Sequence, residues 1–275
     1  MSPQTAALLL TLGVVAGTYG TIVGAGGGFV IIPALLLLYP HEDAAVVTGI
    51  SLAVVLFNAT SGSAAYAVLR RIDYRTGVAF ALATIPGAVV GALATHAVPR
   101  QAFEALFGVV LIAVSAYIAL RPALTEGGGG WRPRPNTHRN LVDAEGNHYS
   151  YAFNWQTGVV ISFFVGLIAS FLGLGGGIIH VPVMVALLDF PAHIAVATSH
   201  FILVFTSLAA TLVHLATGSL SNDWPKVIPL AVGAVAGAQV GARLSQRLPA
   251  KAIVRLLALA LFAAGVRLLI AGAGV

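Results

Sequence analysis

The sequence GAGGGFVIIP, residues 24–33, returns 149 positions later as GLGGGIIHVP, residues 173–182. Both copies lie inside long apolar stretches, at 5–39 and 157–188. Three consecutive glycines weaken a continuous helix, because glycine loses more backbone freedom on folding than any other residue. The same interruption at matching places predicts a structural feature that the fold uses twice.

The composition is that of an integral membrane protein. Of 275 residues, 58% are hydrophobic and 8% are charged, whereas soluble domains carry roughly 25% charged residues. There is no cysteine, which excludes disulfides and thiolate chemistry. The net charge of +5 is modest and calls for no nucleic-acid partner. The first residues lack a basic region and a cleavage site, so we expect a structural helix there rather than a removable signal peptide.

The chain divides into two similar halves. A polar interval rich in glycine and proline, 121–155, separates a first membrane repeat, 1–120, from a second, 156–275. Besides the glycine blocks, Ile72-Asp73-Tyr74 matches Asn222-Asp223-Trp224, and Val98-Pro99 matches Leu248-Pro249. Landmarks in register indicate internal duplication, which is typical of secondary transporters.

Each glycine block divides its apolar stretch into two helices. A helix over 5–39 would be about 50 Å long, against a bilayer core of about 30 Å. The glycines therefore predict a full-length helix, 5–23, and a half-length helix, 29–39, that returns towards its starting side. Three further spans complete each repeat. The expected fold is an all-α polytopic membrane protein.

The distribution of basic residues favours inverted repeats. If each broken segment doubles back, eleven lysines and arginines share one side and only Arg100, Lys226 and Arg267 lie opposite. If it crosses once, the division is nine against five. The positive-inside rule favours the first arrangement. It places the linker 121–155 in the cytoplasm and both termini outside the cytoplasmic (inner) membrane.

The glycine breaks are candidate binding sites for an anion. Unwound backbone inside a bilayer is tolerated only where protein buries it or where it lines a water-filled cavity. Half-helices that start near Phe29 and Ile178 would present free N–H groups and the positive ends of their dipoles at mid-membrane. The amides expected to bind the anion are those of Gly26, Gly27, Gly28, Gly175, Gly176 and Gly177. Helix packing is the alternative role of such glycines, and we prefer it for Gly87, Gly91, Gly237 and Gly241.

Neutral polar side chains cluster in the span after each half-helix. They could donate hydrogen bonds to the oxygens of a bound anion, or they could serve helix–helix contacts. The candidates are Thr48, Ser51 and Asn58 in the first repeat, and Thr198, Ser199 and His200 in the second.

Two buried histidines are the candidates for proton coupling. No carboxylate falls at the centre of a predicted span, so His180 and His200 are the deepest titratable groups. Histidine titrates near neutral pH, but a neutral histidine bonded between helices is equally compatible with the sequence. No metal site and no cofactor are expected.

Two GxGGGxxxxP blocks, each opening half of a duplicated protein, resemble the sulfite exporter TauE/SafE family, also called the toluene-sulfonate uptake permeases. The resemblance covers Gly24 to Pro33, Gly173 to Pro182 and the following Ala197-Thr198-Ser199. The first repeat departs from the Ala-Thr-Ser pattern, because its corresponding stretch is Val47-Thr48-Gly49-Ile50-Ser51. The resemblance implies transport of sulfite, sulfonates or related anions, and it leaves substrate and direction open.

Two other functions stay open. An intramembrane serine hydrolase would use the Ala59-Thr60-Ser61-Gly62 stretch with His200 or His214 as base. A cation-coupled permease for a neutral or zwitterionic solute would bind its cation through backbone carbonyls. The preferred function is not enzymatic: it is alternating-access transport of a small anion across a lipid bilayer. A homodimer is also left open.

Overall fold

The computed structural model describes residues 2–120 and 134–272. Within these residues the chain forms ten α-helices, one short 3-10 turn and one β-hairpin. Part of the predicted linker, 121–133, lies outside the described residues. The predicted all-α membrane class is confirmed.

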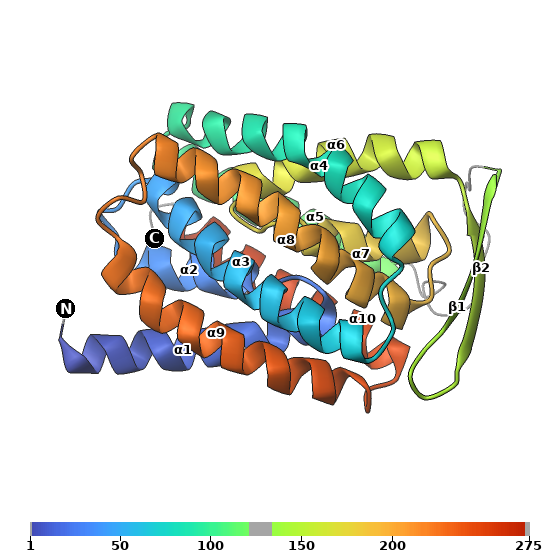
Figure 1. Ribbon diagram of the computed structural model, residues 1–275. Helices are drawn as coiled ribbons and strands as arrows, with labels where there is room; N and C mark the ends of the chain where they lie inside the picture. The colour runs from blue at the N-terminus through green and yellow to red at the C-terminus, as the bar shows by residue number, and fades with distance from the viewer. Residues whose placement is uncertain (1, 121–133, 273–275) are drawn as a thin grey trace.

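Five helices form each half. The first half contains α1 (Pro3–Val23), α2 (Gly28–Leu38), α3 (Ala44–Val68), α4 (Tyr74–Ala94), the turn η1 (Thr95–Ala97) and α5 (Arg100–Leu120). The second contains α6 (Trp155–Phe171), α7 (Gly177–Ala186), α8 (Ala192–Ala216), α9 (Trp224–Ser245) and α10 (Ala250–Gly272). The short helices α2 and α7 begin where the glycine blocks predict (Figure 1).

Several helices are suited to a bilayer. Within the described residues, α1, α3, α4 with η1, α8 and α9 are long and apolar enough to cross a membrane. The helices α2, α6 and α7 are apolar but shorter. This composition is that of a multi-pass membrane protein.

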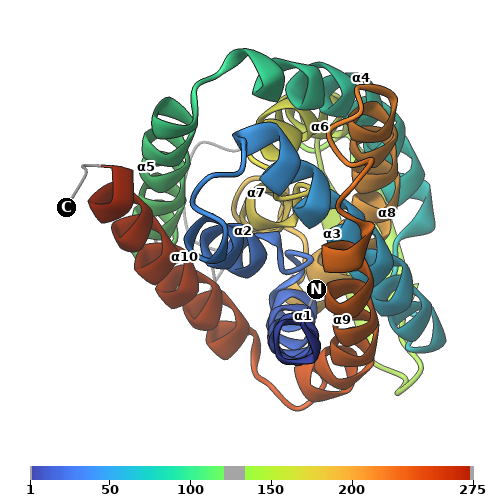
Figure 2. The same ribbon diagram turned by 90° about the vertical axis from the view of Figure 1, so that its left-hand side faces the viewer.

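The two halves interlock through equivalent helix pairs. Helix α1 packs along α9 and α6 along α4, while α3 also contacts α9 and α8 also contacts α4. Helix α5 pairs with α10. Figure 2 shows α2 and α7 in the middle, with other helices around them. The short helices are therefore enclosed by the rest of the bundle.

Glycines permit the close helix pairs. In α4, Cβ atoms on Gly87 and Gly91 would meet the carbonyl oxygens of Phe163 and Leu167 in α6. In α9, a Cβ on Gly237 would likewise meet the carbonyl oxygen of Val14 in α1. The packing role predicted for these glycines is confirmed, and a side chain there would push the helices apart.

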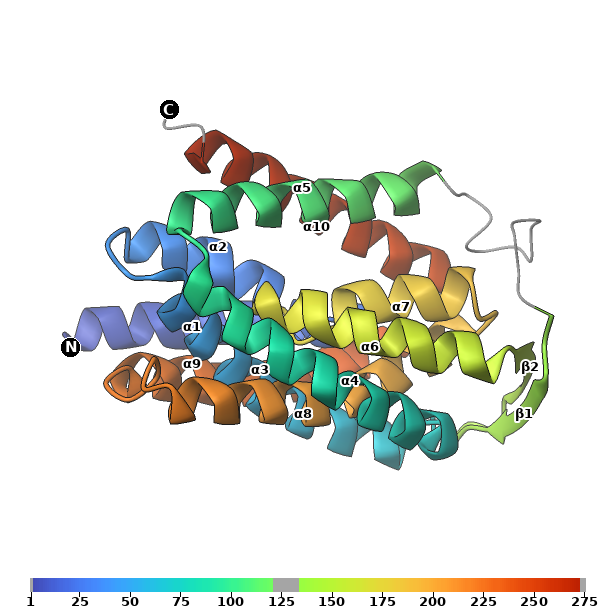
Figure 3. The same cartoon turned by 90° about the horizontal axis from the view of Figure 1, so that it is seen from above.

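The two halves run in opposite directions along the bundle. The N and C labels lie at one end of Figure 1, and the β-hairpin lies at the other. Helix α1 starts at the end with the termini, whereas α6 starts beside the hairpin (Figure 3). This is the arrangement that an odd number of passes per repeat produces. Inversion across a bilayer, and the side on which each end lies, stay predictions.

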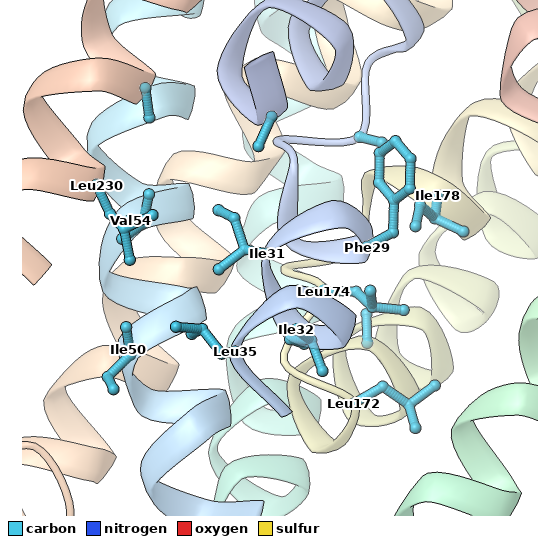
Figure 4. Packing of buried hydrophobic residues seen from close by; sticks show 14 of the residues in the cluster. Phe29, Ile31, Ile32, Leu35, Ile50, Val54, Leu172, Leu174, Ile178 and Leu230 are labelled. Atoms are coloured by element: carbon cyan, nitrogen blue, oxygen red, sulfur yellow. The ribbon is translucent and has the colours of Figure 1, made fainter. Parts of the chain in front are cut away.

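The central core is apolar and surrounds α2. Buried side chains of α2 pack with buried side chains of α3, α6, α7, α9 and the second break (Figure 4). Those labelled there are Phe29, Ile31, Ile32, Leu35, Ile50, Val54, Leu172, Leu174, Ile178 and Leu230. Lipid is as apolar as these residues, so close packing stabilises this core more than escape from water does.

The polar interval contains a β-hairpin that its composition does not reveal. Strand β1 (Thr137–Val142) pairs antiparallel with β2 (His148–Phe153). Gly146, with φ of 85°, lies in the turn between them. Phe153 and Tyr151 pack against Phe190, with ring centroids 4.9 and 4.5 Å apart. The hairpin thus covers the loop between α7 and α8.

Candidate functional site

Both glycine blocks form the same interruption. Helix α1 ends with Gly24 at φ 79°, and α6 is followed by Gly173 at φ 70°, both in the left-handed region. The N–H of Ala25 bonds to the carbonyl of Gly20 at 2.7 Å, and the N–H of Leu174 bonds to that of Ala169 at 2.7 Å. These bonds terminate the two helices in the manner of a Schellman motif.

The half-helices then start on left-handed glycines. Gly27 caps α2 with φ of 85°, and Gly176 caps α7 with φ of 119°. No side chain caps either end. Glycine is required here, because other residues adopt positive φ only at a cost.

Each half-helix leaves three N–H groups without a protein acceptor among the described residues. They are those of Gly27, Gly28 and Phe29 at the start of α2, and of Gly176, Gly177 and Ile178 at the start of α7. The prediction for Gly26 is wrong in this structure, because its N–H already donates to the Gly20 carbonyl at 3.2 Å. Donors of this kind lie at the positive end of a helix dipole and attract negative charge. Six unpaired donors inside the bundle are the strongest feature of the candidate site.

The two breaks lie against each other. A Cβ on Gly28 would come within 2.9 Å of the carbonyl oxygen of Gly173, and a Cβ on Gly177 would overlap the carbonyl oxygen of Gly24. The start of each half-helix therefore touches the break in the other half. Only glycine at both positions allows this approach.

Two serines stabilise the contact between the two glycine breaks. Ser51 in α3 donates to the Gly173 carbonyl at 2.8 Å, and Ser199 in α8 donates to the Gly24 carbonyl at 3.1 Å. Each serine bonds to the break of the opposite half. Ser51 and Ser199 occupy equivalent places, because each is the eighth residue of its helix.

Replacing Ser51 or Ser199 by alanine is expected to destabilise the protein by about 1–3 kcal/mol, because a buried carbonyl loses its donor. The double variant should lower the melting temperature by more than either single variant and slow transport. Thermal unfolding in detergent and flux in liposomes check this. Thr60→Ala is the matched control, since that hydroxyl bonds within its own helix and is exposed. Wild-type behaviour of the double variant would contradict the assignment.

The other predicted polar residues lie at varying distances from the breaks. Thr48 bonds back to the carbonyls of Ala44 and Ala45, and its Cγ2 would lie 2.9 Å from a Cβ on Gly173. Thr198 instead accepts from the N–H of Asp73 at 3.0 Å. Thr48 thus borders the second break, whereas Thr198 supports the start of α4.

Asn58 and His200 belong to one buried network beside the first break. Asn58 donates to the carbonyls of Gly17 and Ala234, and it accepts from Thr21 at 3.3 Å. The Nε2 atom of His200 lies 3.3 Å from the same Thr21 hydroxyl. The network joins α1, α3, α8 and α9 one turn before Gly24.

His180 lies beside the second break. Its ring is buried, and Nε2 lies 3.2 Å from the hydroxyl of Ser162. Nδ1 would lie 3.5 Å from a Cβ on Gly176. One predicted histidine therefore adjoins each break. Among the described residues, no group of three His, Asp or Glu side chains is placed to hold a metal ion.

A cluster of charged residues that the sequence does not single out fixes the hairpin. Arg71 and Asp143 form a buried ion pair, with Nη2 3.0 Å from Oδ2 and side chains 4% and 0% exposed. Tyr151 donates to Asp73 at 2.9 Å, and Arg139 lies 3.5 Å from the same carboxylate. The turn-forming DAEGN stretch, followed by alternating polar and aromatic residues at 148–151, is the sequence signal for this hairpin.

The other end of the bundle is closed by a second group of ions. Lys226 pairs with Glu42 at 2.6 Å and with Asp223 at 2.7 Å. Arg100 donates to the carbonyl of Leu36 in the last turn of α2 and to those of Tyr39 and Glu42 in the loop that follows. Ion pairs thus join the first half to the hairpin at one end and to the second half at the other.

The hairpin is expected to loosen in acid. Burial raises the pKa of Asp143, but hydrogen bonds from Asn147, Arg71 and the Glu145 N–H outweigh it and lower the pKa to about 2. A depressed carboxyl pKa stabilises the fold above about pH 4, and the gain is lost as pH falls towards 2. Hydrogen exchange of 137–153, corrected for intrinsic rates, should rise across that window. Constant protection from pH 5 to 2 would contradict this.

Paired helix breaks inside a bundle of membrane-spanning helices are typical of membrane transporters. The chain belongs to the family described as Sulfite exporter TauE/SafE, whose family model matches residues 9–268. It is similar to the "Probable membrane transporter protein YunE" of Bacillus subtilis, at 31% identity over 96% of this chain and 97% of the relative. A "Probable membrane transporter protein ORF9" of Sinorhizobium sp is 28% identical over 96% of this chain and 92% of its own length. No solved structure matches the chain.

Proposed function

We propose that the protein is a secondary transporter of sulfur-containing anions, sulfite or sulfonates, across the cytoplasmic (inner) membrane by alternating access. The observation that carries the proposal is the contact of each half-helix N-terminus with the break of the opposite half, together with six N–H groups that lack acceptors among the described residues. Such ends bind oxyanions without a charged side chain. The sulfur chemistry is inferred from the family, since the geometry alone specifies only an anion.

The charge distribution supports an anion rather than a cation. Within the described residues, every aspartate and glutamate lies in a loop, in the hairpin, at a helix cap or, for Glu104, in the second turn of a helix. Among the described residues no carboxylate lies beside the breaks: the polar side chains there are Thr48, Ser51, Ser199, His180 and the Asn58–Thr21–His200 network. A cation-coupled permease would have to use backbone carbonyls, and those of Gly24 and Gly173 already accept from serines.

Alternating access would open one end of the bundle at a time. The Arg71–Asp143 pair closes the hairpin end, and the Lys226–Glu42 pair closes the other. With the linker in the cytoplasm and the termini outside, these ends would face the cytoplasm and the exterior. The halves would rock about the breaks, and His180 and His200 would couple the movement to protons. The transported partner is a small anion, and no cofactor is required.

An intramembrane hydrolase is the weaker alternative. Ser61 donates to the carbonyl of Val235 at 3.0 Å and lies 2.9 Å from Nε2 of Gln239. Among the described side chains no histidine is hydrogen-bonded to Ser61, so the serine has no adjacent base. This favours a transporter without enzymatic activity.

Uptake of labelled sulfite into liposomes containing the purified protein tests the proposal. Sulfite, sulfonates, carboxylates and sulfate should be compared, with and without a pH gradient. We expect saturable flux that sulfur oxyanions inhibit and carboxylates do not. No anion flux with correctly inserted protein would refute the proposal and leave the cation-coupled alternative.

A further inference from the structure

Two apolar side chains occupy the place where the glycine breaks meet. A Cβ on Gly26 would lie 2.9 Å from Cγ1 of Val55 and 3.5 Å from Cδ1 of Leu203. A Cβ on Gly175 would lie 2.7 and 2.8 Å from the same two side chains. Val55 and Leu203 therefore each contact both breaks.

The two residues are equivalents in the two halves. Val55 follows Ser51 by one helical turn in α3, and Leu203 follows Ser199 by one turn in α8. Each helix thus presents the same two features to the place where the breaks meet. A serine bonds to a carbonyl of one break, and one turn later an apolar side chain packs over a left-handed glycine. Residues four apart share a helix face.

The space around this pair is filled. Val55 and Leu203 are 0% and 1% exposed. They form a small apolar cluster with Ala59 and Val204, separate from the central core. Even one methyl group on Gly26 or Gly175 would be too close to them. An anion that approaches the breaks along this face therefore requires α3 and α8 to move away from Gly26 and Gly175, and a larger substituent requires a larger movement.

We propose that Val55 and Leu203 set the size limit for the anion, so that the site takes a small inorganic oxyanion such as sulfite and discriminates against sulfonates with large organic groups. This inference rests on the proposed function. The two residues determine specificity through volume, and they offer no polar group to the substrate.

Shortening either side chain should admit larger anions. In liposomes, the ratio of kcat/KM for benzenesulfonate to that for sulfite is measured for wild type, Val55→Ala and Leu203→Ala. We expect the ratio to rise at least about tenfold in both variants, which is the discrimination that one or two methylene groups supply in an apolar pocket. Leu203→Val, a smaller change, should shift the ratio in the same direction and is available if the alanine variants insert poorly.

Val54→Ala and Ile202→Ala are matched controls. Val54 and Ile202 are the neighbours in sequence and are equally buried, but they belong to other apolar clusters. Their ratios should stay within about threefold of wild type. A shift no larger in the Val55 and Leu203 variants than in these controls overturns the proposal, as does a wild type that prefers benzenesulfonate to sulfite. A wild type that moves no anion refutes the proposed function itself, and the size limit falls with it.

Discussion

Replacing Gly177 by alanine is expected to abolish anion transport. The added Cβ would overlap the carbonyl oxygen of Gly24, a main-chain atom that Ser199 holds in place. Because no flexible side chain can yield, the start of α7 must move away from the first break. The donors of the site move with it, and a displacement of about 1 Å can cost about 100-fold in rate. The initial rate of labelled sulfite uptake, per amount of inserted protein, measures the effect.

Gly176→Ala is the control for this experiment. The position is one residue away in the same block, but the nearest atom to a Cβ there is Nδ1 of His180 at 3.5 Å. Only the backbone strain at φ 119° remains, at a cost of about 1–3 kcal/mol. This variant should be less stable yet retain measurable flux. If Gly177→Ala transports as fast as wild type, the contact between the breaks does not form the site.

The places where the long helices break could be predicted from the sequence. Three glycines followed by an apolar run too short to span a bilayer allow few alternatives, and α2 and α7 begin one residue before the predicted positions. The strength of this prediction comes from the bilayer, which restricts unpaired backbone to buried places. Gly26 and Gly175 also face Val55 and Leu203, which no sequence pattern indicates.

The equivalence of Ser51 and Ser199 was harder to predict. The glycine blocks are 149 residues apart, but α7 is one residue shorter than α2, so α3 and α8 are related by 148. A search for repeats that keeps the spacing of 149 residues aligns Ser51 with His200 instead of Ser199. The sequence also does not show which of Thr198 and Ser199 meets a break, because adjacent helical residues point about 100° apart. Ser199 meets a break, and Thr198 meets Asp73.

Replacing Asp143 by alanine is expected to release the hairpin from the bundle. Removing one partner of a buried ion pair costs about 3–5 kcal/mol, because the other charge stays buried without compensation. Arg71 is 4% exposed, and its remaining partner, Glu145, lies 3.4 Å away and is 53% exposed. Undocking of the hairpin relieves the uncompensated charge. Amide exchange of residues 137–153 should therefore accelerate by at least about 100-fold, since each 1.4 kcal/mol corresponds to a factor of ten.

Two further variants test whether loss of the ion pair, rather than a general weakening of the turn, releases the hairpin. Glu145→Ala removes an exposed pair with the same arginine and should change exchange less than about fivefold. The double variant Arg71→Met with Asp143→Leu replaces the ion pair by apolar side chains and should restore most of the protection, because apolar substitutes for buried pairs are often neutral. If the hairpin stays protected in Asp143→Ala, the aromatic contacts of Phe190 with Tyr151 and Phe153 are sufficient to hold it. In that case the ion pair would not be what closes this end of the bundle.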